Sequence, residues 1–98
     1  MEKRTPHCEL SIVRRLIAEG KARATFTAST SARALGFDLP GMISVVQALT
    51  PSDFYKSMTS YTDHRVWQDV YRPATKYGRV YLKLPVVDDL LIVSFKEL

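Results

Sequence analysis

The sequence predicts a single α+β domain, in which N-terminal helices pack on one face of an antiparallel β-sheet. Two observations support this fold class. Apolar residues recur at helical spacing in the first half of the chain, and from residue 54 they alternate as strands require. The 98 residues contain no internal repeat, linker or low-complexity segment. Residues 1–98 are therefore expected to fold as one unit.

The first predicted helix covers residues 9–19, where four apolar side chains lie on one face. Gly20 follows at the position of a C-terminal cap. Residues 23–27, RATFT, then form a short expected strand.

Two further helices are expected before the sheet. One starts at Ser29 or Ser31 and ends at Gly36. The other begins after Asp38, whose side chain suits an N-cap, and ends before Pro51. This third helix carries an apolar stripe made of Met42, Val45, Val46 and Leu49.

The alternating segments near the C terminus predict a β-hairpin with a two-residue turn at Asp88 and Asp89. This turn would place three apolar pairs on the helix-covered side: Leu82 with Phe95, Leu84 with Val93, and Val86 with Leu91. On the other side Tyr81 would lie directly opposite Lys96, with Cβ atoms about 5 Å apart.

Polar side chains are unusually frequent in residues 54–73, where Lys56 belongs to the first long strand and Gln68 to the second. A four-residue loop between the strands would put these two side chains on opposite faces. An odd-length loop or a bulge would put them on the same face. In the second case the uncovered side of the sheet gathers Lys56, Gln68, Tyr81 and Lys96 in one cluster.

Such a cluster suits cleavage of RNA by attack of the 2′-hydroxyl on its own 3′-phosphate, for which no metal or other cofactor is essential. Lysines supply positive charge, and Gln68 supplies a neutral donor. Tyr81 beside Lys96 could transfer a proton. Two neighbouring lysines also lower each other's pKa from about 10.4, which would make one a usable base. The alternative is a solvated sheet face without catalytic function.

Three further residues are candidates for RNA binding: Trp67 by stacking on bases, and Arg72 and Lys83 by contact with phosphate. The alternatives are a core position for Trp67 and solvated positions for the two cations. His7 and Cys8 are adjacent, but without further well-spaced ligands they do not indicate a metal site.

Charge, cysteine content and hydropathy indicate the expected compartment and partners of the protein. The formal charge is +4, and basic and acidic residues are evenly distributed, so charge alone is weak evidence for a nucleic-acid partner. The single cysteine, Cys8, excludes an internal disulfide and fits the reducing cytoplasm. The sequence shows no signal peptide and no apolar run of the about 20 residues that span a membrane, so no membrane association is expected.

Several segments of the sequence resemble the motility quorum-sensing regulator toxins. These segments are PSDFYKSMTSYTDHRVWQDVYRP, VYLK and LIVSFKEL, together with MEKRTPH and LGFDLPGM nearer the N terminus. The resemblance implies a fold similar to RelE and YoeB, which are small ribonucleases. It also implies a toxin of a type II toxin–antitoxin system that cleaves mRNA at GC-containing sites such as GCU, without metal, and arrests growth. The family's functional residues match Lys56, Gln68, Tyr81 and Lys96.

The resemblance further implies a protein partner, an MqsA-like antitoxin with a zinc-binding domain and a helix-turn-helix domain. DNA would then be bound only through the toxin–antitoxin complex. Asp88 stands where some members of the family carry His, so this chain lacks a cation at that turn. Two alternatives are a non-catalytic RNA-binding repressor of translation and a corepressor that acts through its partner.

Overall fold

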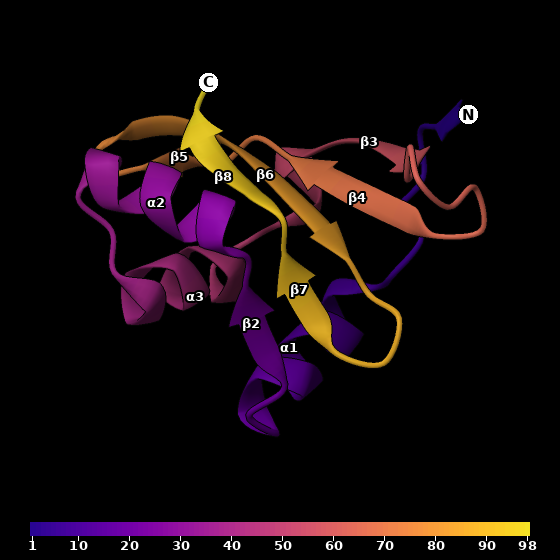
Figure 1. Ribbon diagram of the computed structural model, residues 1–98, viewed down its shortest axis with the longest axis horizontal. Helices are drawn as coiled ribbons and strands as arrows, with labels where there is room; N and C mark the ends of the chain where they lie inside the picture. Colours follow the sequence, from indigo (N-terminus) through magenta and orange to yellow (C-terminus); the bar gives the residue numbers. More distant parts are fainter.

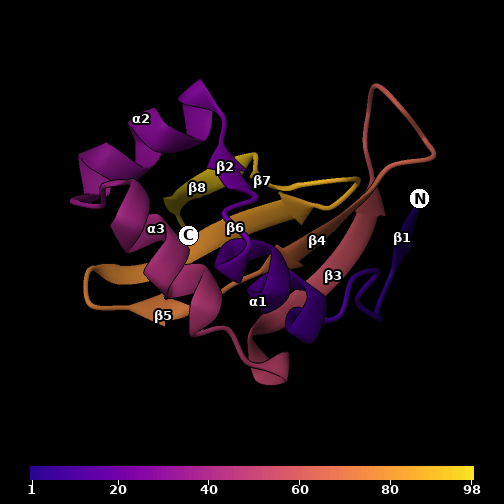
Figure 2. The ribbon, with the colours of Figure 1, turned by 90° about the horizontal axis from the view of Figure 1, so that it is seen from below.

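The computed structural model describes residues 1–98 and confirms the α+β fold class, with three helices and a mainly antiparallel sheet (Figures 1 and 2). The elements follow in the order β1 (Glu2–Lys3), α1 (Leu10–Ala18), β2 (Ala22–Ala24), α2 (Phe26–Leu35), α3 (Leu39–Gln47), η1 (Pro51–Asp53), β3 (Phe54–Thr59), β4 (Trp67–Tyr71), β5 (Ala74–Thr75), β6 (Gly78–Pro85), β7 (Leu90–Ile92) and β8 (Ser94–Glu97). None of the helices is long and apolar enough to cross a membrane.

The main sheet has the strand order β1-β3-β4-β6-β5, and β8 also pairs with β6. All pairings within it are antiparallel. A separate parallel pair, β2 with β7, lies beside α1 and joins the helical layer to the sheet (Figure 1). Figure 1 shows the helices gathered on the lower side of the sheet, so the opposite side carries no helix.

Two of the three helices, α2 and α3, begin at a residue whose side chain caps the helix. Helix α1 agrees with the predicted range to within one residue at each end. The Asp38 carboxylate accepts a hydrogen bond of 2.8 Å from the Gly41 amide, which confirms Asp38 as the N-cap of α3. Gly36 ends α2 with a φ of 104°, a left-handed conformation that favours glycine.

The predicted boundary between the strand at 23–27 and the second helix was wrong. Strand β2 ends at Ala24, and α2 already begins at Phe26. The cause is Thr25, whose hydroxyl accepts a hydrogen bond from the Ala28 amide and caps the helix ahead of both predicted serine caps.

The hairpin turn also differs from its prediction. Val86 pairs with Leu90 instead of Leu91, so the connection is longer than Asp88 and Asp89 alone. A two-residue hairpin turn of the favoured type needs positive φ angles, and no non-glycine residue of this chain adopts one. Leu90 and Ile92 therefore point into the core in place of Leu91 and Val93. Further from the turn the predicted register is confirmed, since Leu82 pairs with Phe95.

The hydrophobic core lies between the helices and the sheet. The strands contribute side chains such as Leu82, Leu84 and Phe95, and the helices contribute Val13, Met42 and Val46. These six side chains are almost completely buried. The core occupies only the helix side of the sheet, and this leaves the opposite face available for polar side chains.

Candidate active site

The pairing of β3 with β4 settles the position of Lys56 relative to Gln68. Lys56 pairs with Val70, and Gln68 pairs with Met58. Directly paired residues of antiparallel strands share a face, so all four belong to the same face of the sheet. An odd number of residues, 60–66, separates the two paired strands, which is the second of the two arrangements considered from the sequence.

The neighbouring strands extend this face. Val70 pairs with Lys83 of β6, and the side chain of Tyr81 lies on the same face two residues earlier. Tyr81 pairs with Lys96 of β8, which confirms the predicted pairing. The residues between these positions, such as Leu82 and Phe95, point into the core. We call the surface formed by Lys56, Gln68, Tyr81, Lys83 and Lys96 the lysine face.

Two ammonium groups of the lysine face lie close to the Tyr81 ring. Lys96 Nζ is 5.3 Å from the ring centroid, and Lys83 Nζ is 5.8 Å from it. Cations at this distance are attracted by the aromatic ring and hold it in place. The phenol thus lies beside two cations that can bind a phosphate and stabilise negative charge.

Beside the lysine face, three cations lie close to the ring of Tyr55. The sequence did not reveal this group. The Arg72 guanidinium lies 3.8 Å from the centroid of the Tyr55 ring, with Lys56 at 5.4 Å and Arg4 at 5.6 Å. Strict alternation would put Tyr55 on the face opposite Lys56. The pairing of β3 with β4 shifts between Phe54 and Lys56, and this irregularity lets Tyr55 join the cations.

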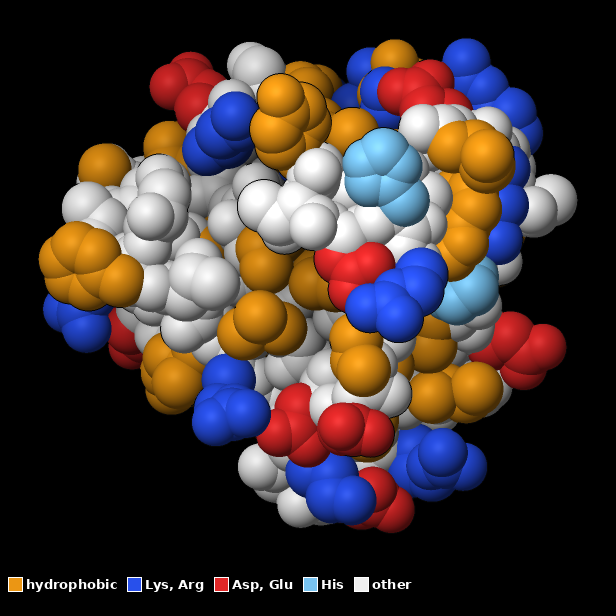
Figure 3. All heavy atoms as spheres, turned by 45° about the vertical axis from the view of Figure 1, so that its right-hand side comes forward, with side chains coloured by type: hydrophobic (Ala, Val, Ile, Leu, Met, Phe, Trp, Pro, Cys, Tyr) orange, Lys and Arg blue, Asp and Glu red, His pale blue; other side chains and the backbone are white.

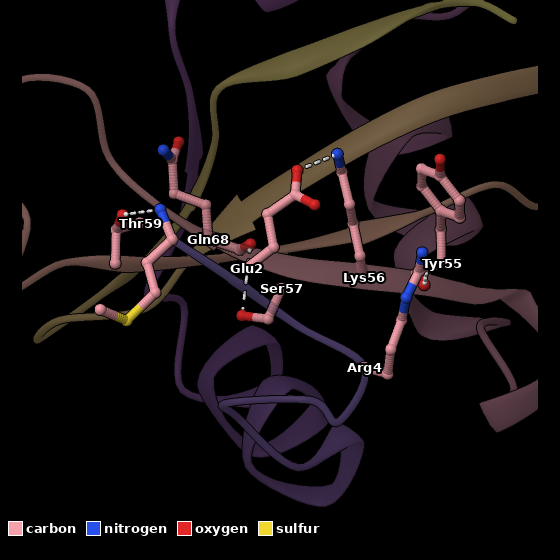
Figure 4. Close-up of polar contacts among 8 residues, drawn as sticks. Glu2, Arg4, Tyr55, Lys56, Ser57, Thr59 and Gln68 are labelled. Carbon is pink, nitrogen blue, oxygen red and sulfur yellow. Dashed lines mark hydrogen bonds and ion pairs between the residues drawn. The ribbon is translucent and has the colours of Figure 1, made fainter.

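Lys56 is ion-paired with Glu2 of the edge strand β1. Figure 4 shows the two side chains pointing toward each other, with Gln68 projecting on the same side of the sheet and Ser57 on the opposite side. The hydrogen bond with Glu2 raises the pKa of Lys56, and the same contact lowers the pKa of Glu2. The prediction of lysines that lower each other's pKa is therefore wrong for Lys56.

Lys83 is the amine of this face whose pKa is lowered. Burial against the sheet is the main cause, and the positive charges of Lys96 and Lys56 add to it. Lys83 was expected from the sequence only as a phosphate-binding residue. Its central position on β6 now also makes it a second candidate for proton transfer.

Trp67 does not lie on the lysine face. It pairs with Thr59, and its ring lies on the opposite side, where His7 stacks on it at 5.8 Å between centroids and Lys3 Nζ lies 4.2 Å away. Figure 3 shows the side of the molecule that carries both histidines, with Lys and Arg side chains gathered at its upper right edge. Stacking of Trp67 on an RNA base would have to occur away from the lysine face.

Comparisons with known proteins agree with the resemblance seen in the sequence. Residues 5–97 match a family described as "Motility quorum-sensing regulator, toxin of MqsA". The chain is 57% identical over 97 residues to the mRNA interferase toxin MqsR of Escherichia coli strain K12, and this similarity covers 99% of both chains. The matched range includes every strand that contributes to the lysine face.

Proposed function

The chain belongs to the motility quorum-sensing regulator toxin family, and we propose from this premise that it is a toxin that cleaves mRNA. The observation that carries the proposal is the convergence of Lys56, Gln68, Tyr81 and Lys96 on one uncovered sheet face. A full-length relative at this level of identity bears the name mRNA interferase, which supports the same activity here.

In the proposed reaction the ribose 2′-hydroxyl attacks the adjacent phosphorus, and the bond to the 5′-oxygen breaks. The products are a 2′,3′-cyclic phosphate and a free 5′-hydroxyl. Lys56 and Lys96 bind the scissile phosphate and stabilise the additional negative charge of the transition state. Gln68 orients the phosphate or a base, and Tyr81 gives a proton to the leaving oxygen. No step of this reaction requires a cofactor.

The cleavage preference that we propose is for GC-containing sites such as GCU, and the consequence is growth arrest. We expect Arg72 to extend the phosphate-binding surface, because its guanidinium lies over the same Tyr55 ring that Lys56 approaches. The proposed setting is the cytoplasm, where mRNA is available.

The proposed protein partner is an MqsA-like antitoxin with a zinc-binding domain and a helix-turn-helix domain. The family description, toxin of MqsA, supports this partner. The toxin would contact DNA only within that complex, because the antitoxin supplies the helix-turn-helix domain.

The deciding experiment incubates the purified protein with a defined transcript in EDTA, with and without the antitoxin. We expect discrete fragments, mapped by primer extension, that carry cyclic phosphate and 5′-hydroxyl ends and that disappear when antitoxin is added. RNA that is bound but stays intact would overturn the enzymatic proposal in favour of a translational repressor. Cleavage that requires added Mg²⁺ would overturn the metal-independent chemistry.

A further inference from the structure

The N-terminal segment carries a carboxylate to the lysine face and is held there at several points. Glu2 pairs with Met58 of β3, and the Thr59 amide donates a 2.9 Å hydrogen bond to the Met1 carbonyl. Further along, the buried Asp69 carboxylate accepts hydrogen bonds from the amides of His7 and Cys8, at distances from 2.9 to 3.1 Å. The backbone that carries Glu2 is therefore fixed relative to the sheet.

The reaction proposed above needs a group that accepts the proton of the 2′-hydroxyl. Lys56 is a poor acceptor, because its contact with Glu2 raises the pKa of the ammonium. Among the salt bridges of the structure, the one between Glu2 and Lys56 alone brings a carboxylate to the lysine face. The pKa of Glu2 is lowered, first by the hydrogen bond with Lys56 and then by its charge, with smaller effects from Arg4 and the terminal amine. Glu2 is consequently ionised at neutral pH.

The geometry of the ion pair leaves one carboxylate oxygen free. Glu2 Oε1 accepts the hydrogen bond from Lys56 Nζ, whereas Oε2 has no hydrogen-bond partner in the protein. The Glu2 side chain is 52% exposed, and that of Lys56 only 18%. In RNA the 2′-hydroxyl lies on the carbon next to the one that bears the phosphate. A phosphate bound by Lys56 would therefore bring its 2′-hydroxyl to the carboxylate beside that lysine.

We propose that Glu2 is a catalytic residue, the general base that takes the proton from the attacking 2′-hydroxyl. This inference rests on the ribonuclease function proposed above. The Glu2 carboxylate gains the proton, the 2′-oxygen forms its bond to phosphorus, and the bond from phosphorus to the 5′-oxygen breaks. Tyr81 donates its hydroxyl proton to the 5′-oxygen. Glu2 then releases its proton to water and Tyr81 regains one, so that the protein returns to its starting state.

The test compares wild-type protein with Glu2→Gln in single-turnover cleavage of a short RNA across a range of pH. The same RNA with a 2′-deoxy substitution at the cleaved position measures binding without cleavage. We expect Glu2→Gln to lose about 10²- to 10⁴-fold in rate, the usual contribution of a general base, with binding changed by less than about threefold. The acidic limb of the pH–rate profile should disappear with the carboxylate.

Two further variants make the result specific. Glu2→Asp keeps the carboxylate and should retain more activity than Glu2→Gln, with an acidic limb still present. Glu19→Gln is the matched control, since Glu19 is also an exposed carboxylate beside a lysine, with 3.6 Å between it and Lys21 Nζ, but lies at the end of α1. This control should cleave at the wild-type rate. An affinity tag is placed at the C terminus so that β1 stays free.

Several results would overturn the assignment. Wild-type rates in Glu2→Gln would show that the carboxylate is dispensable. Tighter RNA binding with an unchanged rate would show that Glu2 only competes with phosphate for Lys56. An acidic limb that persists in Glu2→Gln but is lost in Lys83→Met would transfer the base to Lys83. A wild-type protein that leaves RNA intact would instead refute the ribonuclease proposal itself.

Discussion

At the scale of single residues, Tyr81, which we propose as the acid, lies beside two lysines that can support it electrostatically. Lys83 and Lys96 both approach its ring, and its backbone pairs directly with that of Lys96. Tyr81 occupies a half-buried position on β6, which pairs with β4 and β8, so the sheet sets its backbone position relative to Lys83 and Lys96. Positioned donors of this kind act without reorganisation during the reaction.

We predict that Tyr81→Phe, and separately Lys56→Ala, abolish growth arrest and reduce cleavage at least about 10²-fold, because each removes a group acting on the transition state. The melting temperature of Tyr81→Phe should stay close to that of the wild type. Tyr61→Phe is the matched control, since the Tyr61 side chain is 97% exposed in the β3–β4 loop. Wild-type toxicity of both site variants would refute the assignment.

Lys83 gives a prediction about stability and pH. Its pKa in the folded protein lies below the ordinary value of 10.5, chiefly because of burial. Below the folded pKa the lysine is charged in both states, and its charge destabilises the fold. Between the folded pKa and 10.5 the unfolded chain binds more protons, so stability rises with pH in that window.

We therefore expect Lys83→Met to be more stable than the wild type at pH 7, with a difference that shrinks as the pH approaches 10.5. Urea unfolding followed by circular dichroism at several pH values measures this. Lys76→Met, which replaces an exposed lysine in the β5–β6 turn, is the control. A stability difference that grows with pH would contradict the predicted direction.

At the scale of elements, residues 1–8 run across the edge of the sheet and are bound to it at both ends. Asp69 of β4 is buried on the helix side and holds this segment by its hydrogen bonds to the amides of His7 and Cys8. β1 then continues along β3 and delivers Glu2 to the lysine face on the other side. One short segment thus contacts both faces of the sheet.

Asp69→Ala should lower the free energy of unfolding by about 1–3 kcal/mol, because two backbone donors at least partly shielded from water lose their acceptor. Hydrogen exchange should also become faster at the amides of His7 and Cys8 and in β1. Denaturant unfolding and exchange monitored by NMR measure the two effects. Asp88→Ala, in the exposed loop before β7, should change neither quantity. Unaltered exchange in Asp69→Ala would show that this carboxylate does not anchor the segment.

The sequence predicted those elements whose ends depend on local chemistry. Asp38 and Gly36 cap helices through their own side chain or backbone, so nearby residues were sufficient to find α3 and the end of α2. The pairing of Tyr81 with Lys96 followed from alternation along long strands. The register next to the hairpin turn could not be predicted in this way, because Leu90 also pairs with Ala22, a parallel partner far away in the sequence.

The candidate site was likewise predictable only where nearby residues decide which way a side chain points. The sequence identified four polar residues of the lysine face but left the side of Lys56 open, because a single residue of loop length decides it. Tyr55 escaped detection because its orientation depends on an irregularity that strict alternation does not include. Glu2 escaped because its partner Lys56 lies 54 positions away, and no local pattern links them.

At the scale of the whole molecule, the fold places its hydrophobic core and its lysine face on opposite sides of the sheet. The helices and their core side chains occupy one side of the sheet, and the polar groups of the lysine face occupy the other. The net charge of +4 is modest, yet three lysines converge on one surface with Arg72 at its border. This concentration of charge is what single-stranded RNA would meet.

RNA binding should therefore weaken as salt rises. For single strands the slope of log K against log salt is about 0.7 per neutralised phosphate. We predict that Arg72→Ala lowers the slope by about that amount, as measured by fluorescence anisotropy with the 2′-deoxy RNA. Arg33→Ala removes a charge from the last turn of α2, in the helical layer, and should leave the slope unchanged. Equal slopes for Arg72→Ala and the wild type would exclude a phosphate contact by Arg72.

The odd-length connection between β3 and β4 has a consequence for the history of the gene. Removing one codon there, with the downstream strands held in register, would turn Lys56 inward and drive Ser57 out to solvent. Removing two codons would shorten the connection by two residues and leave every side chain on its present face. We therefore expect homologues to differ in the length of this connection by even numbers of residues. Selection would then preserve an odd number of residues there more strictly than the identity of those residues.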